Sequence, residues 1–205
     1  MFRVLQAAGW PIWPLLVASL IALTIIVERG WSLRRSRVAP LHLLRAITQE
    51  IERAGVTQQL VDRLSRGTLL ARIFAAGLSN ARTSREVMRE SLEEAGRVAA
   101  YELDRFLTSL GTIASLAPIM GLFGTVVGMI EIFGAQGGGS MSSNPQQLAH
   151  GISVALYNTA FGLIVAIPSM IFYRHYRAKV DSLVVEMEAE ATKLIEVVHA
   201  ARVRS

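Results

Sequence analysis

The chain has 205 residues, of which 52% are hydrophobic and only 18% are charged. Ordinary soluble domains carry about 25% charged residues, so the composition argues against that class. The absence of cysteine excludes a disulfide framework and thiolate chemistry. A formal net charge of +5 would suit a nucleic-acid-binding protein, and the positions of the basic residues decide whether that applies.

Three segments, 9–27, 106–130 and 148–173, are long and apolar enough to cross a bilayer, which requires about 20 residues. The first could also be a signal peptide, since a basic residue precedes its apolar core. However, no small-x-small cleavage site precedes Glu28 and Arg29. Two prolines also interrupt the core, so we expect a retained membrane helix.

Basic residues are distributed asymmetrically about these segments. Of the 21 Lys and Arg residues, fourteen lie between Arg29 and Arg105, six lie between Arg174 and Arg204, and one is Arg3. Cytoplasmic loops carry the excess of Lys and Arg, so the pattern predicts a periplasmic N-terminus and a cytoplasmic C-terminus. The basicity is therefore a topology signal, and nucleic acid is not an expected partner. Membrane lipid is an expected partner, with Arg34, Arg35 and Arg37 touching anionic headgroups.

This topology divides the chain into seven segments. The three transmembrane helices are 9–27, 106–130 and 148–173. The expected periplasmic segments are 1–8 and 131–147, and the expected cytoplasmic segments are the helical loop 28–105 and the C-terminal helix 174–205.

The cytoplasmic loop has helical periodicity. An apolar stripe predicts a first helix, and a second, shorter helix ends near Gly67; the stripe residues are Leu43, Leu44, Ile47 and Ile51, then Leu60 and Leu64. Residues 68–81 predict another helix. Thr83 and Glu86 have capping-box spacing and predict the start of a long helix.

No glycine or proline separates this long helix from the second span, so one continuous helix of about 45–50 residues is expected. Ser143, Asn144 and Pro145 form a start signal for the third helix. Its apolar period continues past Tyr173 to Val198. The predicted fold class is an all-α membrane protein with three transmembrane helices, two of which extend into long cytoplasmic helices.

Small and polar residues recur at helical spacing in the second and third spans. The stripe of the second span is Thr108, Thr112, Ser115, Pro118, Leu122 and Thr125, and that of the third is Gly151, Ala155, Asn158 or Thr159, Gly162, Ala166 and Ser169. Such residues can bond to their own backbone and hold helices together, or they can line a wet path between subunits. The candidate path residues are Thr125, Thr159, Asn158, Ser115 and Thr112. The candidate packing residues are Gly121, Gly124, Gly128, Gly151, Gly162, Pro118 and Pro168.

No constellation of catalytic or metal-ligating residues is evident. The four histidines are scattered, and the Gly137–Ser140 stretch lacks the lysine of a phosphate loop. We therefore expect no enzyme, metal or cofactor. A proton path usually needs an ionisable group at membrane depth, yet Glu131 and His150 lie only at the outer ends of the spans. A partner must then bring the carboxylate.

Two stretches carry a family resemblance. P-I-M-G-L-F-G-T-V-V-G-M-I from Pro118 and G-I-S-V-A-L-Y-N-T-A-F-G-L-I-V-A-I-P from Gly151 resemble the MotA/TolQ/ExbB proton channel family. The A-I-P ending at Ala166–Pro168 is most similar to its ExbB/TolQ branch. The resemblance implies a homo-oligomer, specifically a homopentamer in the inner membrane of a Gram-negative bacterium.

Such pentamers enclose the single membrane helices of an ExbD/TolR-like dimer, whose aspartate carries the proton. The resemblance further implies that proton flow drives periplasmic or outer-membrane work such as TonB-dependent import, through a TonB-like or TolA-like protein. The family threonines that face the aspartate correspond to Thr125 and Thr159. The chain departs from many relatives at Val154, where they carry a glutamate.

Two alternatives stay open. A flagellar-stator-like subunit would use the same physics, although the shorter cytoplasmic loop, the A-I-P ending and the expectation of three spans rather than four count against it. A non-conducting membrane scaffold is the second alternative. It would not need a polar stripe on both helices.

Overall fold

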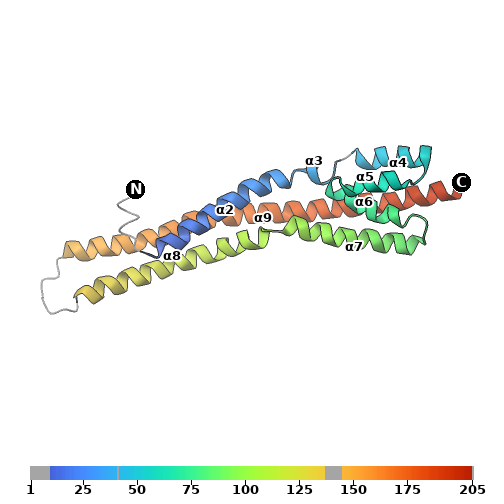
Figure 1. Cartoon of the computed structure of the whole chain (residues 1–205). Coiled ribbons are helices and arrows are strands. Elements are labelled where there is room, and N and C mark those ends of the chain that lie inside the picture. Colours follow the sequence, from blue (N-terminus) through green and yellow to red (C-terminus); the bar gives the residue numbers. More distant parts are fainter. Residues whose placement is uncertain (1–9, 41, 137–144, 205) are drawn as a thin grey trace. The chain divides into compact units, whose positions relative to one another are not determined.

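The computed structural model describes residues 10–40, 42–136 and 145–204. These residues form helices α2 to α9 with no strand among them, which confirms the all-α fold class (Figure 1). The chain divides into two compact units. The first unit comprises residues 1–28 and 106–175, and the second unit comprises 29–105 and 176–205.

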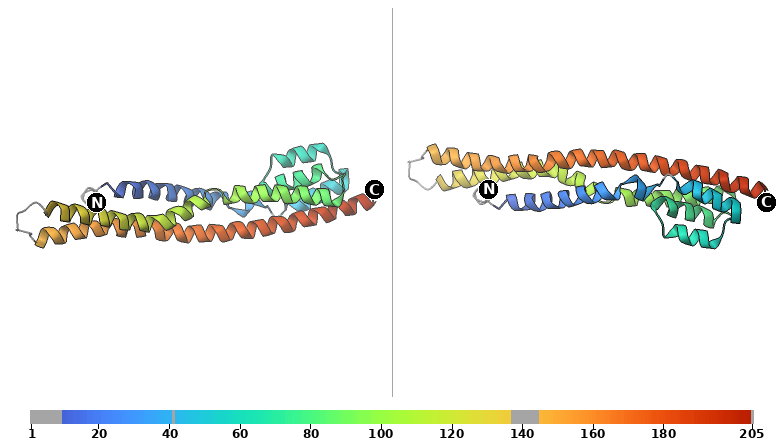
Figure 2. Two further views of the ribbon diagram at one scale, coloured as in Figure 1. Left: turned by 90° about the horizontal axis from the view of Figure 1, so that it is seen from below. Right: turned by 90° about the horizontal axis from the view of Figure 1, so that it is seen from above.

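The first unit consists of long apolar helices. Most of α2 (Ile12–Ser32), all of α8 (Leu107–Gln136) and the first half of α9 (Pro145–Arg204) belong to it. In both views of Figure 2, α8 lies beside the first half of α9 and runs in the opposite direction. Pro145 begins α9, as the sequence predicts, whereas Ser143 and Asn144 lie outside the described residues.

Three helical stretches are long and apolar enough to cross a membrane. They are Ile12–Ser32 and windows within Arg85–Gly134 and Ala155–Ala200, and each predicted span falls largely on one of them. Large apolar side chains point outward from all three helices; Leu20, Ile130 and Ile164 are examples that are 65–67% exposed. In water such surfaces would promote association, whereas lipid or neighbouring membrane helices would cover them.

The core of the first unit is built from small and branched side chains. Leu15 of α2 packs with Ala117 of α8 and with Val165 and Ala166 of α9, all of them buried. The half-buried side chains of Ile113, Met120 and Phe161 surround this cluster. Alanines at the contact allow the three helices to come close together.

The second unit is an assembly of amphipathic helices. It contains α3 (Arg35–Val38), α4 (Leu43–Ala54), α5 (Gln58–Ser65), α6 (Leu69–Ser79) and α7 (Arg85–Asp104), together with the second half of α9. Helix α6 packs against both α5 and α7 and is buried along most of its length. This confirms the helices predicted in the loop.

The predicted apolar stripes face the interior of this unit. Ile47 and Ile51 of α4 and Leu60 and Leu64 of α5 are buried. The tail of α9 remains helical to Arg204 and buries its predicted stripe, namely Val180, Leu183, Met187, Ala191, Leu194 and Val198. The extension of the third span into a long amphipathic helix is therefore confirmed.

The expected continuous helix through the second span is wrong, because α7 ends at Asp104 and α8 begins at Leu107. Arg105 is extended, and Phe106 has φ +65°, in the left-handed region that costs a side chain about 1–2 kcal/mol. A break leaves carbonyls at the end of α7 without helical partners. Buried Arg29 donates a hydrogen bond to one of them, the Leu103 oxygen, at 3.3 Å.

The predicted capping box is displaced by one residue. Ser84 caps α7, since its hydroxyl accepts the Val87 N–H at 3.3 Å. Thr83 instead donates its hydroxyl to the Asn80 carbonyl at 2.7 Å, within the turn that follows α6. The hydroxyl of Thr83 is therefore used by the preceding turn, and the neighbouring serine provides the cap.

A glycine-to-alanine pair tests the packing of α6 on α7. A methyl group on Gly77 would lie 2.6 Å from the Leu92 Cδ2 atom, whereas one on Gly96 would meet nothing within 4 Å. Gly77→Ala should lower the free energy of unfolding by about 1–3 kcal/mol, because the added methyl group would overpack the contact with Leu92. Gly96→Ala should raise stability by up to about 1 kcal/mol through helix propensity. Thermal denaturation in detergent measures both, and equal behaviour would contradict this packing.

Candidate functional site

The backbones of α8 and α9 approach each other at two glycines. A methyl group on Gly162 would lie 2.5 Å from the Ala117 carbonyl oxygen, and one on Gly121 would lie 2.8 Å from the Asn158 carbonyl oxygen. Real side-chain carbons essentially never come so close to another heavy atom. Only glycine fits at either position, because backbone atoms cannot rotate away as a side chain can. This close contact of small residues is typical of packed membrane helices.

The contact extends toward the C-terminal end of α8. A methyl group on Gly124 would lie 2.8 Å from both Cβ and Cγ of Asn158, and one on Gly128 would lie 3.2 Å from the Ala155 Cβ atom. Gly121, Gly124 and Gly128 thus share one face of α8. Gly151 lies within α9, but its side-chain surroundings fall outside the described residues, as do those of Val154.

Asn158 is buried at the centre of this contact. Its side chain is 1% exposed and packs against the space that Gly124 leaves open. A carboxamide in an apolar environment is costly unless it is hydrogen-bonded, and its planar group has two donors and an acceptor. The structure therefore buries the most polar candidate between α8 and α9 of the same chain.

Thr125 and Thr159 each follow a residue of the contact, Gly124 and Asn158 respectively. Both threonines are half-buried, so each lies at the margin of the α8–α9 contact. The Thr125 hydroxyl donates to the Leu122 carbonyl at 2.6 Å. A hydroxyl that donates to its own helix keeps lone pairs that can accept a proton or a hydrogen bond from another group.

Thr112 and Ser115 lie on an exposed face of α8. The Thr112 hydroxyl donates to the Thr108 carbonyl at 2.9 Å, and that of Ser115 lies 3.0 Å from the Gly111 and Thr112 carbonyls. The structure does not bring these two residues into the contact with Asn158. Their face is available to another chain.

Two prolines lie inside the membrane helices. Pro118 is half-buried in α8, and Pro168 is exposed in α9. Each lacks the N–H that would complete one helical hydrogen bond, which neighbouring groups can compensate in membrane helices. Ser169, beside Pro168, is 1% exposed and donates to the Val165 carbonyl at 2.7 Å.

Sequence reasoning missed a second close contact between the same helices. A methyl group on Gly111 would lie 3.0 Å from the ring of Tyr173. Gly111 is in register with the buried residues Ala114 and Ala117, which precede Gly121 on the same face. The spacing of three or four small residues could have identified it.

Ionisable groups do not cluster in the described part of the first unit. Glu131, near the C-terminal end of α8, is exposed. Throughout the described residues, no group of three or more His, Asp or Glu side chains could hold a metal ion. The contact between α8 and α9 can therefore pack the two helices and present hydroxyl groups. Among the described residues of the first unit, no cluster of ionisable groups lies beside those hydroxyls.

Three long apolar helices with a glycine-lined, hydroxyl-flanked contact define a helical multi-span membrane protein. Residues 65–189 match the model of the MotA/TolQ/ExbB proton channel family, and the chain belongs to that family. The match includes all of α8 and the first three quarters of α9.

Individual relatives agree with this assignment. The chain is 33% identical to an ExbB-like biopolymer transport protein of Synechocystis sp., over 81% of this chain and 66% of the relative. It is 29% identical to an ExbB homologue of Methanothermobacter thermautotrophicus, over 75% and 54%. It is 35% identical to the biopolymer transport protein ExbB of Aquifex aeolicus, over 64% and 90%. The chain thus spans less than two thirds of the length of the first two.

Alanine substitution tests the α8–α9 contact. Gly162→Ala should lower the free energy of unfolding by about 1–3 kcal/mol, because the added carbon would force two backbones apart. Gly134→Ala, in the opposing helix α8, should have little effect or be slightly stabilising, since nothing lies within 4 Å of the added methyl group. Unfolding monitored by tryptophan fluorescence in detergent compares them. A Gly162→Ala protein as stable as Gly134→Ala would refute the close approach.

Proposed function

We propose that the chain is the channel-forming subunit of an inner-membrane motor that converts proton motive force into work in the cell envelope. The observation that carries this proposal is the family match, which includes both polar membrane helices. The names of the relatives, biopolymer transport proteins of the ExbB type, support the same role. The work would be a transport process of the cell envelope, such as TonB-dependent import.

The proton carrier belongs to a partner in this proposal. An ExbD/TolR-like dimer with one membrane helix per chain would sit within a homopentamer of this chain and would contribute the aspartate. The sequence of α8 up to Ile130 and of α9 from Gly151 to Tyr173 contains no acidic or basic residue, so this chain supplies no obvious carrier there. A TonB-like or TolA-like protein would receive the work.

In this arrangement the chain would solvate the carboxylate without trapping it. Hydroxyls of Thr125 and Thr159 would hydrogen-bond the partner's carboxylate in either protonation state. A fixed cation would instead stabilise only the charged form and would stop proton release. Exposed Thr112 and Ser115 would extend the polar wall, and Asn158 would support it from behind.

The energy available is sufficient for such a step. One elementary charge that crosses 100 mV supplies about 2.3 kcal/mol, so a few protons could drive a conformational step of several kcal/mol. The family resemblance places a glutamate in many members where this chain has Val154. The proposed relay would operate without that group, or the glutamate is a structural group whose loss is tolerated.

The proposed topology follows the basic residues. The N-terminus and the 131–147 connection would be periplasmic, and the 28–105 loop and the C-terminal helix would be cytoplasmic. The second unit would then lie in the cytoplasm, where its many arginine–glutamate pairs would be solvated.

One observation favours a second candidate, a non-conducting scaffold. Thr112, Ser115 and Thr125 all donate to carbonyls of their own helix, which a purely structural membrane helix would also show. A scaffold would assemble with partners through the second unit and would carry no current. Proton flux separates the two candidates.

Valine substitution tests the channel role, because valine keeps the shape of threonine and removes the hydroxyl. With the partner reconstituted in liposomes, Thr125→Val and Thr159→Val should each reduce potential-driven proton uptake at least about tenfold, the loss expected for a hydrogen bond of about 1.5–3 kcal/mol to a charged group. A pH-sensitive dye inside the liposomes measures the uptake.

Two controls accompany these variants. Thr24→Val removes a hydroxyl that bonds to the Leu20 carbonyl of α2, and it should leave uptake unchanged. Thr125→Ser and Thr159→Ser keep the hydroxyl and should retain most of the flux. Full flux in both valine variants would eliminate the channel-wall role, and no flux in the unmodified complex would favour the scaffold.

A further inference from the structure

Arginines gather beside an exposed tryptophan where α2 ends. Trp31 lies in the last turn of α2 and is 59% exposed. Arg34, Arg35 and Arg37 follow within six residues, the last two in the short helix α3. The guanidinium carbon of Arg37 lies 4.8 Å from the centroid of the Trp31 ring, which is a cation–π contact. Tryptophan is the aromatic side chain that favours this contact most.

Buried apolar anchors hold this segment in place. Leu33 is fully buried and Val38 is 2% exposed, so both sides of the arginine segment are packed into the second unit. The backbone N–H of Arg37 donates to the Arg34 carbonyl at 2.9 Å and forms a tight turn. The basic side chains therefore extend from an ordered backbone.

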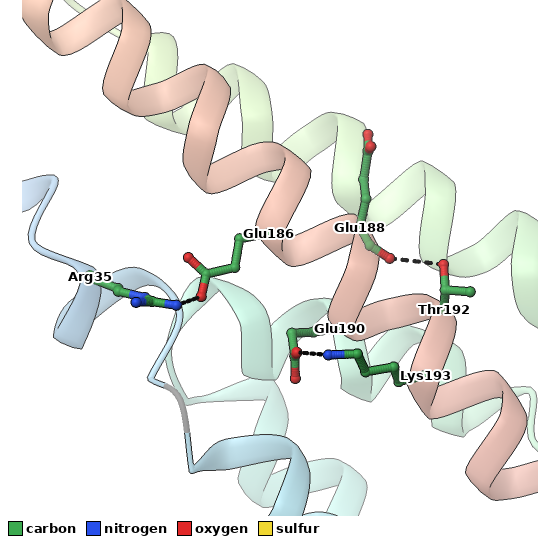
Figure 3. A network of polar contacts seen from close by, with 6 residues as sticks. All are labelled: Arg35, Glu186, Glu188, Glu190, Thr192 and Lys193. Carbon is green, nitrogen blue, oxygen red and sulfur yellow. Dashed lines mark hydrogen bonds and ion pairs between the residues drawn. The ribbon is translucent and has the colours of Figure 1, made fainter.

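Only part of the positive charge is neutralised within the protein. Arg35 forms an ion pair with Glu186 of α9, as Figure 3 shows. Among the described carboxylates, none forms an ion pair with Arg34 or Arg37. Both of these arginines are exposed. They leave two exposed cations, of which Arg37 contacts the ring of Trp31.

Helix α2 carries exposed apolar side chains as far as Trp31. Leu20, Leu23 and Val27 are each 59–67% exposed, and their helical spacing continues to Trp31. Tryptophan is enriched at membrane–water interfaces, where an apolar ring lies beside polar headgroups. Two arginines that follow such a tryptophan in the sequence suit the phosphate of a lipid headgroup.

We propose that Trp31, Arg34 and Arg37 form a binding site for the headgroup of an anionic phospholipid. This inference rests on the membrane placement of α2 in the proposed function. Guanidinium groups bind phosphate oxygens through paired hydrogen bonds, which a lysine ammonium cannot reproduce. The contact with the Trp31 ring would hold Arg37 in position, and none of the described carboxylates pairs with its guanidinium group, which can then bind the phosphate.

Native mass spectrometry of the full chain, purified in detergent and depleted of lipid, tests the site. Dioleoylphosphatidylglycerol and dioleoylphosphatidylcholine are the two probes. The unmodified protein should prefer phosphatidylglycerol. Arg34→Gln combined with Arg37→Gln should weaken phosphatidylglycerol binding about 25-fold, since each basic residue near a membrane surface contributes about fivefold.

Matched controls separate a site from general charge. Arg45→Gln combined with Arg53→Gln removes the same charge from the exposed face of α4 and should change binding less than about twofold. Trp31→Leu should weaken phosphatidylglycerol binding several-fold and leave phosphatidylcholine binding unchanged. Equal losses in the two double variants, or an unchanged preference in Arg34→Gln/Arg37→Gln, would overturn the site.

One further measurement distinguishes a lipid headgroup from a soluble phosphate as the ligand. A second distinguishes failure of the lipid site from failure of the proposed membrane motor. Glycerol phosphate should not displace the lipid, and displacement at similar concentration would identify a soluble phosphate site instead. Carbonate extraction of membranes shows whether the chain is inserted. A chain that is not inserted would refute the membrane motor, whereas an inserted chain without lipid preference would refute only the lipid site.

Discussion

Between α8 and α9 the separation is set by backbone atoms, because Gly162 lies against the Ala117 carbonyl and Gly121 against the Asn158 carbonyl. Backbone groups in a helix have little freedom to move, so this contact tolerates no additional carbon. Asn158 is buried as a consequence, since the missing side chain at Gly124 leaves room for it. The neighbouring residues Thr125 and Thr159 then lie at the margin of the contact, half-buried.

A helix pair held in this way can present polar groups without carrying charge. The hydroxyls of Thr112, Ser115 and Thr125 are each bonded to their own helix, which removes the penalty for placing them in an apolar environment. Their remaining lone pairs are available to another chain. These hydroxyls therefore satisfy the requirements of membrane insertion and those of the proposed proton path.

The break between α7 and α8 shows how distant residues determine local structure. Arg105 and Phe106 leave the helical conformation although neither is glycine or proline. Arg29, far earlier in the chain, donates to the Leu103 carbonyl, and Arg177 of α9 pairs with Asp104. Positive charge at a helix C-terminus is favourable, so both cations stabilise the end of α7 where it is.

The sequence by itself determined the helical class, the three apolar stretches, the amphipathic helices between them and the family. These features depend on composition and periodicity, which are local and repeat over many residues. Tertiary structure alone decided three others: the helix end at Asp104, the use of Ser84 as the cap of α7, and the burial of Asn158 against Gly124. Each depends on one contact with a partner that no local pattern specifies. The periodic stripes placed Asn158 and Thr159 among the small and polar residues of the third span, whereas only the packed helices distinguished the buried amide from the half-buried hydroxyl.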